Sequence, residues 1–208
     1  MIRVLAVVAA VVLASTGTAW AAGLTLSTAH LGASSVTTPT MYPMSVAFGN
    51  KNGGTVGKVQ SGDTIGFVWS QQVDEASLCS GWSNSSSSQS LTLQWSVVNG
   101  ASGAHDTLQV TGSSSTCVGG FHVGTIDLGA AGYDTSATSI DFPTTTNVLS
   151  VGAATTTLTV TLGGQVNGTA GTVGSGSAAI WTPVSTIKDR SGRACGTNLA
   201  QSTTTVQF

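Results

Sequence analysis

The chain has 208 residues, a formal net charge of −2 and only 7 % charged residues, against roughly 25 % in an average globular protein. So weak a charge gives no basis for binding nucleic acid or an anionic membrane surface, and we expect neither as a partner. Disorder is excluded for most of the length, because disordered chains combine low hydrophobicity with high net charge, whereas the mean hydropathy here is positive.

Residues 1–21 are predicted to be a secretory signal peptide. Arg3 supplies a positive charge, Val4–Ala14 is an uninterrupted apolar run, and Ala19–Trp20–Ala21 is a small-residue cleavage site. The apolar run has 11 residues, which is too short for a membrane-spanning helix of about 20 residues. We therefore expect cleavage after Ala21 (or one residue later), no transmembrane segment in the mature chain, and a protein that is secreted or held at the cell surface.

The mature chain is predicted to be all-β, in the form of an antiparallel β-sandwich. Strong helix formers are scarce, whereas the abundant Thr favours strands and the abundant Ser and Gly favour turns. Residues 22–49 are expected to be an extended segment that leads into the domain and includes an edge strand, and residues 50–208 to form the sandwich, since strands recur about every ten residues. The strands are expected within residues 63–70, 91–97, 105–111, 121–128, 147–151, 155–162, 177–184 and 203–208.

Residues 91–97 alternate most cleanly, with all their apolar side chains on one face. Residues 105–111 return along the chain after a short turn, so the two segments are predicted to form a hairpin. The alternation of residues 121–128 slips near Gly124, which is typical of a β-bulge. Residues 74–81 are expected to form either a single helical turn or a polar connection.

Two glycine-rich segments, residues 52–62 and 167–176, resemble each other. Each leads into a predicted strand that carries a tryptophan, Trp69 in the first case and Trp181 in the second. Two interpretations remain open, namely a duplicated half-domain or one type of turn used twice. The second is favoured because the similarity stops at the strands.

The chain contains three cysteines, Cys79, Cys117 and Cys195, and an odd number in an exported protein leaves one over. We expect a disulfide between Cys79 and Cys117, because these two flank the predicted hairpin and a bridge would tie its ends together. Cys195 would then be a buried thiol or an intermolecular link. A fully reduced chain remains the alternative.

No recognisable catalytic or metal-binding set is found in the sequence. His105 and Asp106 are neighbours on a predicted strand and so point to opposite faces. Apart from Asp74–Glu75, the acidic residues occur singly, whereas a glycosidase needs two carboxylates that face one sugar. The spacing of Cys and His does not match a zinc site. We therefore expect no enzyme, no cofactor and no metal, and leave open a calcium ion bound by loop carboxylates.

The basic residues of the mature chain form two groups, Lys51 and Lys58 in the first and Lys188, Arg190 and Arg193 in the second. If the two groups met in the fold, they would make a small positive patch. Isolated solvated charges are the simpler expectation.

Trp82 lies in a polar segment and is the best candidate for an exposed aromatic ring. An exposed ring could stack on a sugar. A secreted carbohydrate-binding module, with Trp82 as the stacking residue, is therefore the alternative function.

Residues 53–70 begin with a glycine-rich turn and continue through Gly-Asp-Thr into a predicted strand that ends at a Ser. This order resembles the start of bacterial Ig-like modules of surface and secreted proteins, in which an acidic, Ser-containing connection follows, here residues 71–82. Residues 124–129 and 157–163 are similar to later strands of exported actinobacterial β-sandwich proteins.

Residues 187–193 resemble an Ile-x-Asp-x-x-Gly-Asn turn near the end of such modules, with Arg193 in place of the family's Asn. The resemblance covers residues 50–208 and implies an Ig-like sandwich without catalytic residues. We therefore expect an exported bacterial surface or extracellular protein with a structural or adhesive role. Its partners would be further copies of itself, paired through strand edges that carry few charges, or components of the cell wall or surface.

Overall fold

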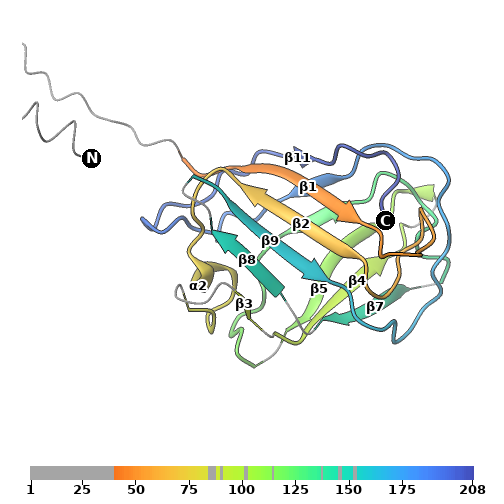
Figure 1. The fold of residues 1–208 in the computed structure, drawn as a ribbon, viewed down its shortest axis with the longest axis horizontal. Coiled ribbons are helices and arrows are strands. Elements are labelled where there is room, and N and C mark those ends of the chain that lie inside the picture. The colour runs from red at the N-terminus through yellow and green to blue at the C-terminus, as the bar shows by residue number, and fades with distance from the viewer. Residues whose placement is uncertain are drawn as a thin grey trace, which may run out of the picture. The chain divides into compact units, whose positions relative to one another are not determined.

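The computed structural model in Figure 1 describes residues 40–83, 88–89, 91–100, 103–113, 115–136, 138–144, 147–151 and 154–208. The predicted signal peptide, residues 1–21, and most of the segment 22–49 lie outside the described residues. Among those described, no helix is both long and apolar enough to cross a membrane.

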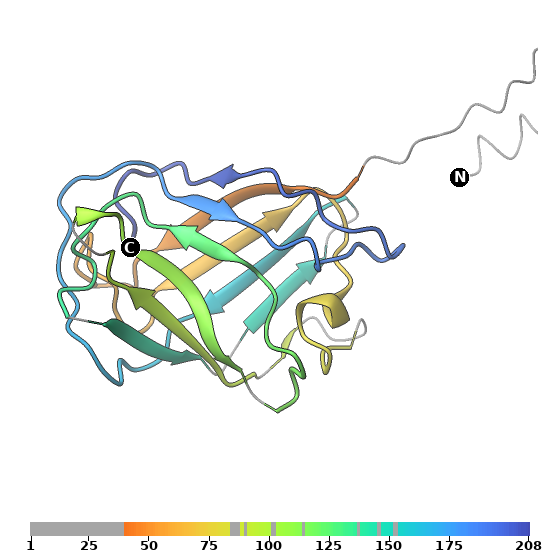
Figure 2. The same ribbon diagram turned by 180° about the vertical axis from the view of Figure 1, so that it is seen from behind.

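Two antiparallel sheets pack face to face, which confirms the predicted all-β sandwich (Figures 1 and 2). The five-stranded sheet has the order β1 (Pro43–Gly49), β2 (Thr64–Trp69), β9 (Thr156–Thr161), β8 (Asn147–Val151) and β3 (Ser88–Gln89). The six-stranded sheet, seen from its outer side in Figure 2, has the order β11 (Ala200–Gln201), β10 (Ile180–Thr182), β6 (Thr125–Asp127), β5 (Thr107–Ser113), β4 (Leu93–Val98) and β7 (Ser139–Thr144). A single short helix, α2 (Glu75–Leu78), follows β2 in the described chain.

An aromatic cluster fills the space between the sheets. Phe67 and Trp69 of β2 point inward and are fully buried, because alternate side chains of a strand face the same side. Phe67 stacks on Trp95 of β4, with ring centroids 5.8 Å apart, and Trp69 meets Trp181 of β10 edge to face at 5.1 Å. The sheets are therefore joined by side chains that the alternation of residues 63–70 and 91–97 had predicted to be internal.

The predicted hairpin is confirmed as β4 and β5, which pair in antiparallel register with a shift between Gln94 and Trp95. Of the two alternatives for residues 74–81, a helical turn is found, as α2. Asp74 begins it, because its side chain accepts a hydrogen bond from the backbone of Ala76 at 3.3 Å.

The strand expected within residues 121–128 is shortened to β6 at the point where the alternation slips. Gly124 has a φ of +92°, and a Cβ added there would lie 2.1 Å from the carbonyl oxygen of Thr182. Only glycine can hold the backbone this close to the end of β10. The backbone is therefore irregular at Gly124 as expected, but the irregularity ends the strand and is not the predicted β-bulge, since the pairings of β6 show no register shift.

The prediction of a strand within residues 203–208 is wrong, since the last strand, β11, ends at Gln201. Side chains take over the backbone hydrogen bonds in this segment. Ser202 accepts from the backbone of Ala179 at 2.9 Å and donates to the carbonyl of Thr204 at 2.7 Å. The Gln207 amide donates to the same carbonyl at 3.0 Å, so the segment turns on itself instead of extending a ladder.

β7 was not expected from the sequence, because Asp141 and Pro143 interrupt its apolar pattern. It is an edge strand, and at an edge the N–H that proline lacks is not needed for pairing with a neighbouring strand. The outer side of β7 is covered by the chain after β9: Val166 donates to the carbonyl of Asp141 at 3.0 Å, and the backbone of Asp141 donates to Asn167 Oδ1 at 2.8 Å.

The two similar glycine-rich segments lie against each other. The backbone of Val173 donates to the carbonyl of Gly57 at 2.8 Å. Gly57 has a φ of +79°, and a Cβ there would be 2.0 Å from the carbonyl oxygen of Val173. The strands that follow the two segments, β2 and β10, belong to different sheets.

Candidate functional site

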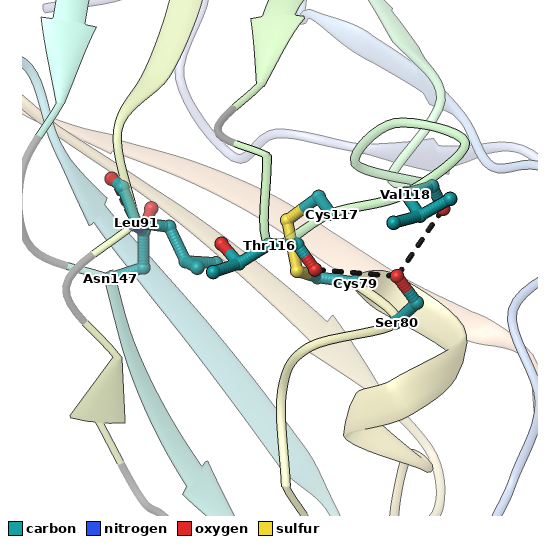
Figure 3. Close-up of a disulfide and its surroundings, with 7 residues drawn as sticks. All are labelled: Cys79, Ser80, Leu91, Thr116, Cys117, Val118 and Asn147. Atoms are coloured by element: carbon teal, nitrogen blue, oxygen red, sulfur yellow. Dashed lines mark hydrogen bonds between the residues drawn. A yellow bond between two sulfur atoms is a disulfide. The ribbon is translucent and has the colours of Figure 1, made fainter.

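A disulfide fastens α2 to the chain that precedes β6, and a hollow of the surface lies beside this junction. Cys79 follows α2 directly and is bridged to Cys117, which confirms the predicted pairing. Figure 3 shows the Ser80 hydroxyl beside the bridge, within 3.3 Å of the carbonyl oxygens of both Thr116 and Val118. The two segments are thus held together by a covalent bond and a polar contact.

The hollow has a volume of about 390 Å³ and is lined by Asp74, Ala76, Ser77, His122, Thr186 and Lys188. Here a serine, a histidine and an aspartate come together, as a hydrolytic site would require. However, Ser77 donates to the carbonyl of Asp74 at 2.6 Å and accepts from the backbone of Lys188 at 2.9 Å. Within the described chain, no hydrogen bond joins the His122 ring to Ser77 or Asp74. The Ser77 hydroxyl is therefore bonded to backbone groups, and no base is positioned to activate it.

His122 also borders a second, smaller hollow of about 240 Å³, lined by residues 110–113 of β5 and residues 119–122. Its own backbone donates to the carbonyl of Leu78 at 2.8 Å, which ties the loop to the end of α2. The two hollows offer hydroxyls and backbone groups on either side of one imidazole.

Asp106 shows how the acidic residues are used. It is fully buried just before β5 and accepts from three backbone N–H groups, those of Gly100, Gly132 and Asp134, at 2.9–3.0 Å. One carboxylate therefore holds two loops that are distant in the sequence. The bonds are charge-assisted, which makes them about twice as strong as neutral ones.

Asp63, at the start of β2, has the same role. It is fully buried and accepts from the backbone of Lys51 at 2.9 Å and of Gln60 at 2.6 Å. Asp141 of β7 accepts instead from side chains, Ser96 at 2.5 Å and Asn167 at 2.6 Å. Both carboxylates are thus engaged inside the protein.

Asp189 organises the turn formed by residues 187–193. The backbones of Ser191 and Arg193 donate to its carboxylate at 2.9 and 3.0 Å, and the Arg193 guanidinium lies 2.8 Å away. Burial alone would raise the pKa of Asp189, but the hydrogen bonds from Ser191 and Arg193 lower it below the ordinary 3.8. The turn therefore keeps its hydrogen bonds with Arg193 in place.

Each of the eight acidic residues accepts a hydrogen bond or forms an ion pair within the protein. Those not yet described in this role are Glu75, paired with Arg190 at 2.6 Å, Asp127, paired with His105 at 2.9 Å, and Asp134, which accepts from the backbone of Ser136 at 2.7 Å. In the described part of the chain, no group of three or more His, Cys, Asp or Glu side chains is placed to hold a metal ion.

The basic residues do not form one patch. Lys51 lies at the start of β2, beside Asp63, whereas Arg190 lies beyond the end of β2, where its backbone donates to the carbonyl of Gln72 at 3.1 Å. The two groups are thus at opposite ends of one strand, and both arginines of the second group, Arg190 and Arg193, are in ion pairs.

The expectation that Trp82 is exposed is wrong. The side chain is 1 % exposed and stacks on Phe121 with ring centroids 6.5 Å apart. The cause is the disulfide, which brings the chain after α2 against residues 117–121, while the backbone of Trp82 donates to the carbonyl of Cys79 at 2.8 Å. Trp82 therefore cannot stack on a sugar.

Cys195 is the free cysteine and is 3 % exposed. Burial raises the pKa of its thiol to about 11. The folded protein thus keeps this thiol protonated and shielded, which disfavours an intermolecular link through it.

Comparison of the chain with protein-family models, with curated proteins and with solved structures finds no match in any of the three.

Proposed function

We propose that this is an exported bacterial protein, an Ig-like β-sandwich that acts in the extracellular space or at the cell surface as a structural or adhesive module without catalytic activity. The observation that carries the proposal is the use of the acidic residues. All eight are engaged as hydrogen-bond acceptors or ion-pair partners inside the protein. Five of them accept hydrogen bonds from backbone N–H groups of loops, namely Asp63, Asp106, Asp127, Asp134 and Asp189. A stable sandwich closed by a disulfide suits an oxidising extracellular location.

The edge of β1 is the surface that we assign to association. β1 has seven residues and no charged side chain, and in the described chain no backbone hydrogen bond from another segment reaches its outer side along Pro43–Gly49. β3 and β11 are two-residue edges, and β7 is covered. β11 packs near β1, but the outer hydrogen-bonding groups of β1 have no ladder partner among the described residues. An uncharged edge strand of this kind pairs readily with other strands.

The test uses two variants that carry the same added charge. Ala47→Lys places a lysine on the edge strand β1, and Thr159→Lys places one on the outer face of the central strand β9. We expect the mature protein to self-associate or to co-sediment with isolated cell walls, and Ala47→Lys to weaken this while Thr159→Lys does not. A protein that stays monomeric at high concentration and does not bind walls would contradict the proposal.

The carbohydrate-binding alternative depended on Trp82. With this ring buried, the residue proposed to stack on a sugar is lost, and we do not pursue this alternative.

A further inference from the structure

The chain contains the dipeptide Asn-Gly three times, at Asn52–Gly53, Asn99–Gly100 and Asn167–Gly168. In this dipeptide the backbone nitrogen of glycine can attack the side-chain amide carbon of asparagine, because glycine has no side chain to hinder the approach. A C–N bond forms, ammonia leaves, and the resulting succinimide is opened by water to aspartate or isoaspartate. The reaction consumes only water and involves no oxidation or reduction.

The fold protects the second and third Asn-Gly sites from this reaction. The Asn99 amide donates hydrogen bonds to the carbonyls of Asp134 at 2.9 Å and Ser136 at 2.8 Å. The N–H of Gly100, whose nitrogen would attack, donates a hydrogen bond to the Asp106 carboxylate at 3.0 Å. A hydrogen bond to a carboxylate opposes the loss of that proton, which the attack requires.

The third site is held by β7. The Asn167 amide donates to Asp141 Oδ2 at 2.6 Å, and its Oδ1 accepts from the Asp141 backbone at 2.8 Å. Gly168 is packed so closely that an added Cβ would lie 2.4 Å from the carbonyl oxygen of Ser139. Rotation of the Asn167 side chain toward Gly168 would break both amide contacts.

The first site has none of these restraints. Asn52 and Gly53 are both exposed in the turn between β1 and β2, and among the described residues nothing bonds to the Asn52 amide or to the backbone nitrogen of Gly53. The turn is closed by one bond, from the Gly54 backbone to the carbonyl of Lys51 at 2.9 Å. Gly53 has a φ of +73° and no atom within 4 Å of an added Cβ.

We propose that Asn52 is a site of spontaneous deamidation, and that the fold restricts the reaction to this one of the three Asn-Gly sequences. The product adds one negative charge beside Lys51, and in the isoaspartate form it also lengthens the main chain of the β1–β2 turn. This chemistry does not depend on where the protein is located.

The test follows the three sites in one sample. The folded, oxidised protein is incubated at mildly alkaline pH, and peptide mass spectrometry with an isoaspartate assay measures conversion at each asparagine. We expect Asn52 to convert at least about tenfold faster than Asn99 and Asn167, since one protecting hydrogen bond corresponds to about that factor. Asn52→Gln should abolish most of the acidic species that the whole protein accumulates.

The control is the same chain unfolded in guanidinium chloride, in which the three sites should convert at similar rates. Conversion of Asn52 in the folded protein that is no faster than that of the other two would overturn the proposal. A preference for Asn52 that persists unchanged in the unfolded chain would also overturn it, because the fold would then not be its cause.

Discussion

Replacement of Asp106 should show how much of the stability depends on a single carboxylate. Three backbone N–H groups point at it in a fully buried position, and a hydrogen bond to a charged group contributes about 1.5–3 kcal/mol. Asp106→Ala would leave all three groups unpaired and should cost about 5 kcal/mol. Asp106→Asn keeps the shape but replaces one of the two acceptor oxygens by an NH2 donor, and should cost about 3 kcal/mol.

The assay is equilibrium unfolding in urea with the disulfide intact, compared with Asp74→Asn as a matched control. Asp74 accepts one N–H, at 3.3 Å at the start of α2, so the same change there should cost less than about 1 kcal/mol. Since a domain is stable by only about 5–15 kcal/mol, the asparagine variant should fold and be measurable even if the alanine variant does not. Equal losses for Asp106→Asn and Asp74→Asn would refute the reasoning.

Three further predictions concern the disulfide and the charged pairs. Replacing both Cys79 and Cys117 by Ala should lower the free energy of unfolding by about 4 kcal/mol on the chain-entropy model, given a sequence separation of 38 residues; a loss under about 1 kcal/mol would contradict it. Arg190→Met removes the guanidinium that pairs with the buried carboxylate of Glu75 at 2.6 Å and should cost about 3 kcal/mol. The added change Glu75→Gln should restore part of this loss. Urea unfolding of the single and double variants checks the prediction, and no recovery would count against the pairing. Asp189 has a pKa below 3.8, so its ionised carboxylate stabilises the fold above pH 3.8, and this stabilisation is lost as the pH falls through the lowered pKa. The difference in unfolding free energy between wild type and Asp189→Asn should therefore shrink in acid. A constant difference across that range would show that the carboxylate charge is not the cause.

The strands that follow simple alternation could be predicted from the sequence. Residues 91–97 read as a half-buried strand because each apolar side chain is separated from the next by a polar one, and β4 is found there. β7 could not be found in this way, because Pro143 and the buried Asp141 break the pattern. Its place at the edge and the hydrogen bonds of Asp141 to Ser96 and Asn167 make both residues acceptable, and these depend on tertiary structure.

The candidate site was predictable only in part. The pairing of Cys79 with Cys117 followed from their positions around the hairpin, but its effect on Trp82 did not. A polar sequence around a tryptophan suggests exposure, whereas the bridge brings Phe121 onto the ring. The roles of Asp63 and Asp106 were equally hidden, because their backbone partners come from other loops and leave no spacing signal in the sequence.

The central claim is that the protein is exported and folds in an oxidising compartment. It is tested most directly by fractionating the native cells into medium, wall, membrane and cytosol and measuring the intact mass and free thiols of the protein in each. The account predicts a chain in the medium or the wall that begins near Ala22, contains the Cys79–Cys117 bridge, and has one thiol that reacts only after unfolding. A full-length chain in the cytosol with three reduced cysteines would contradict it.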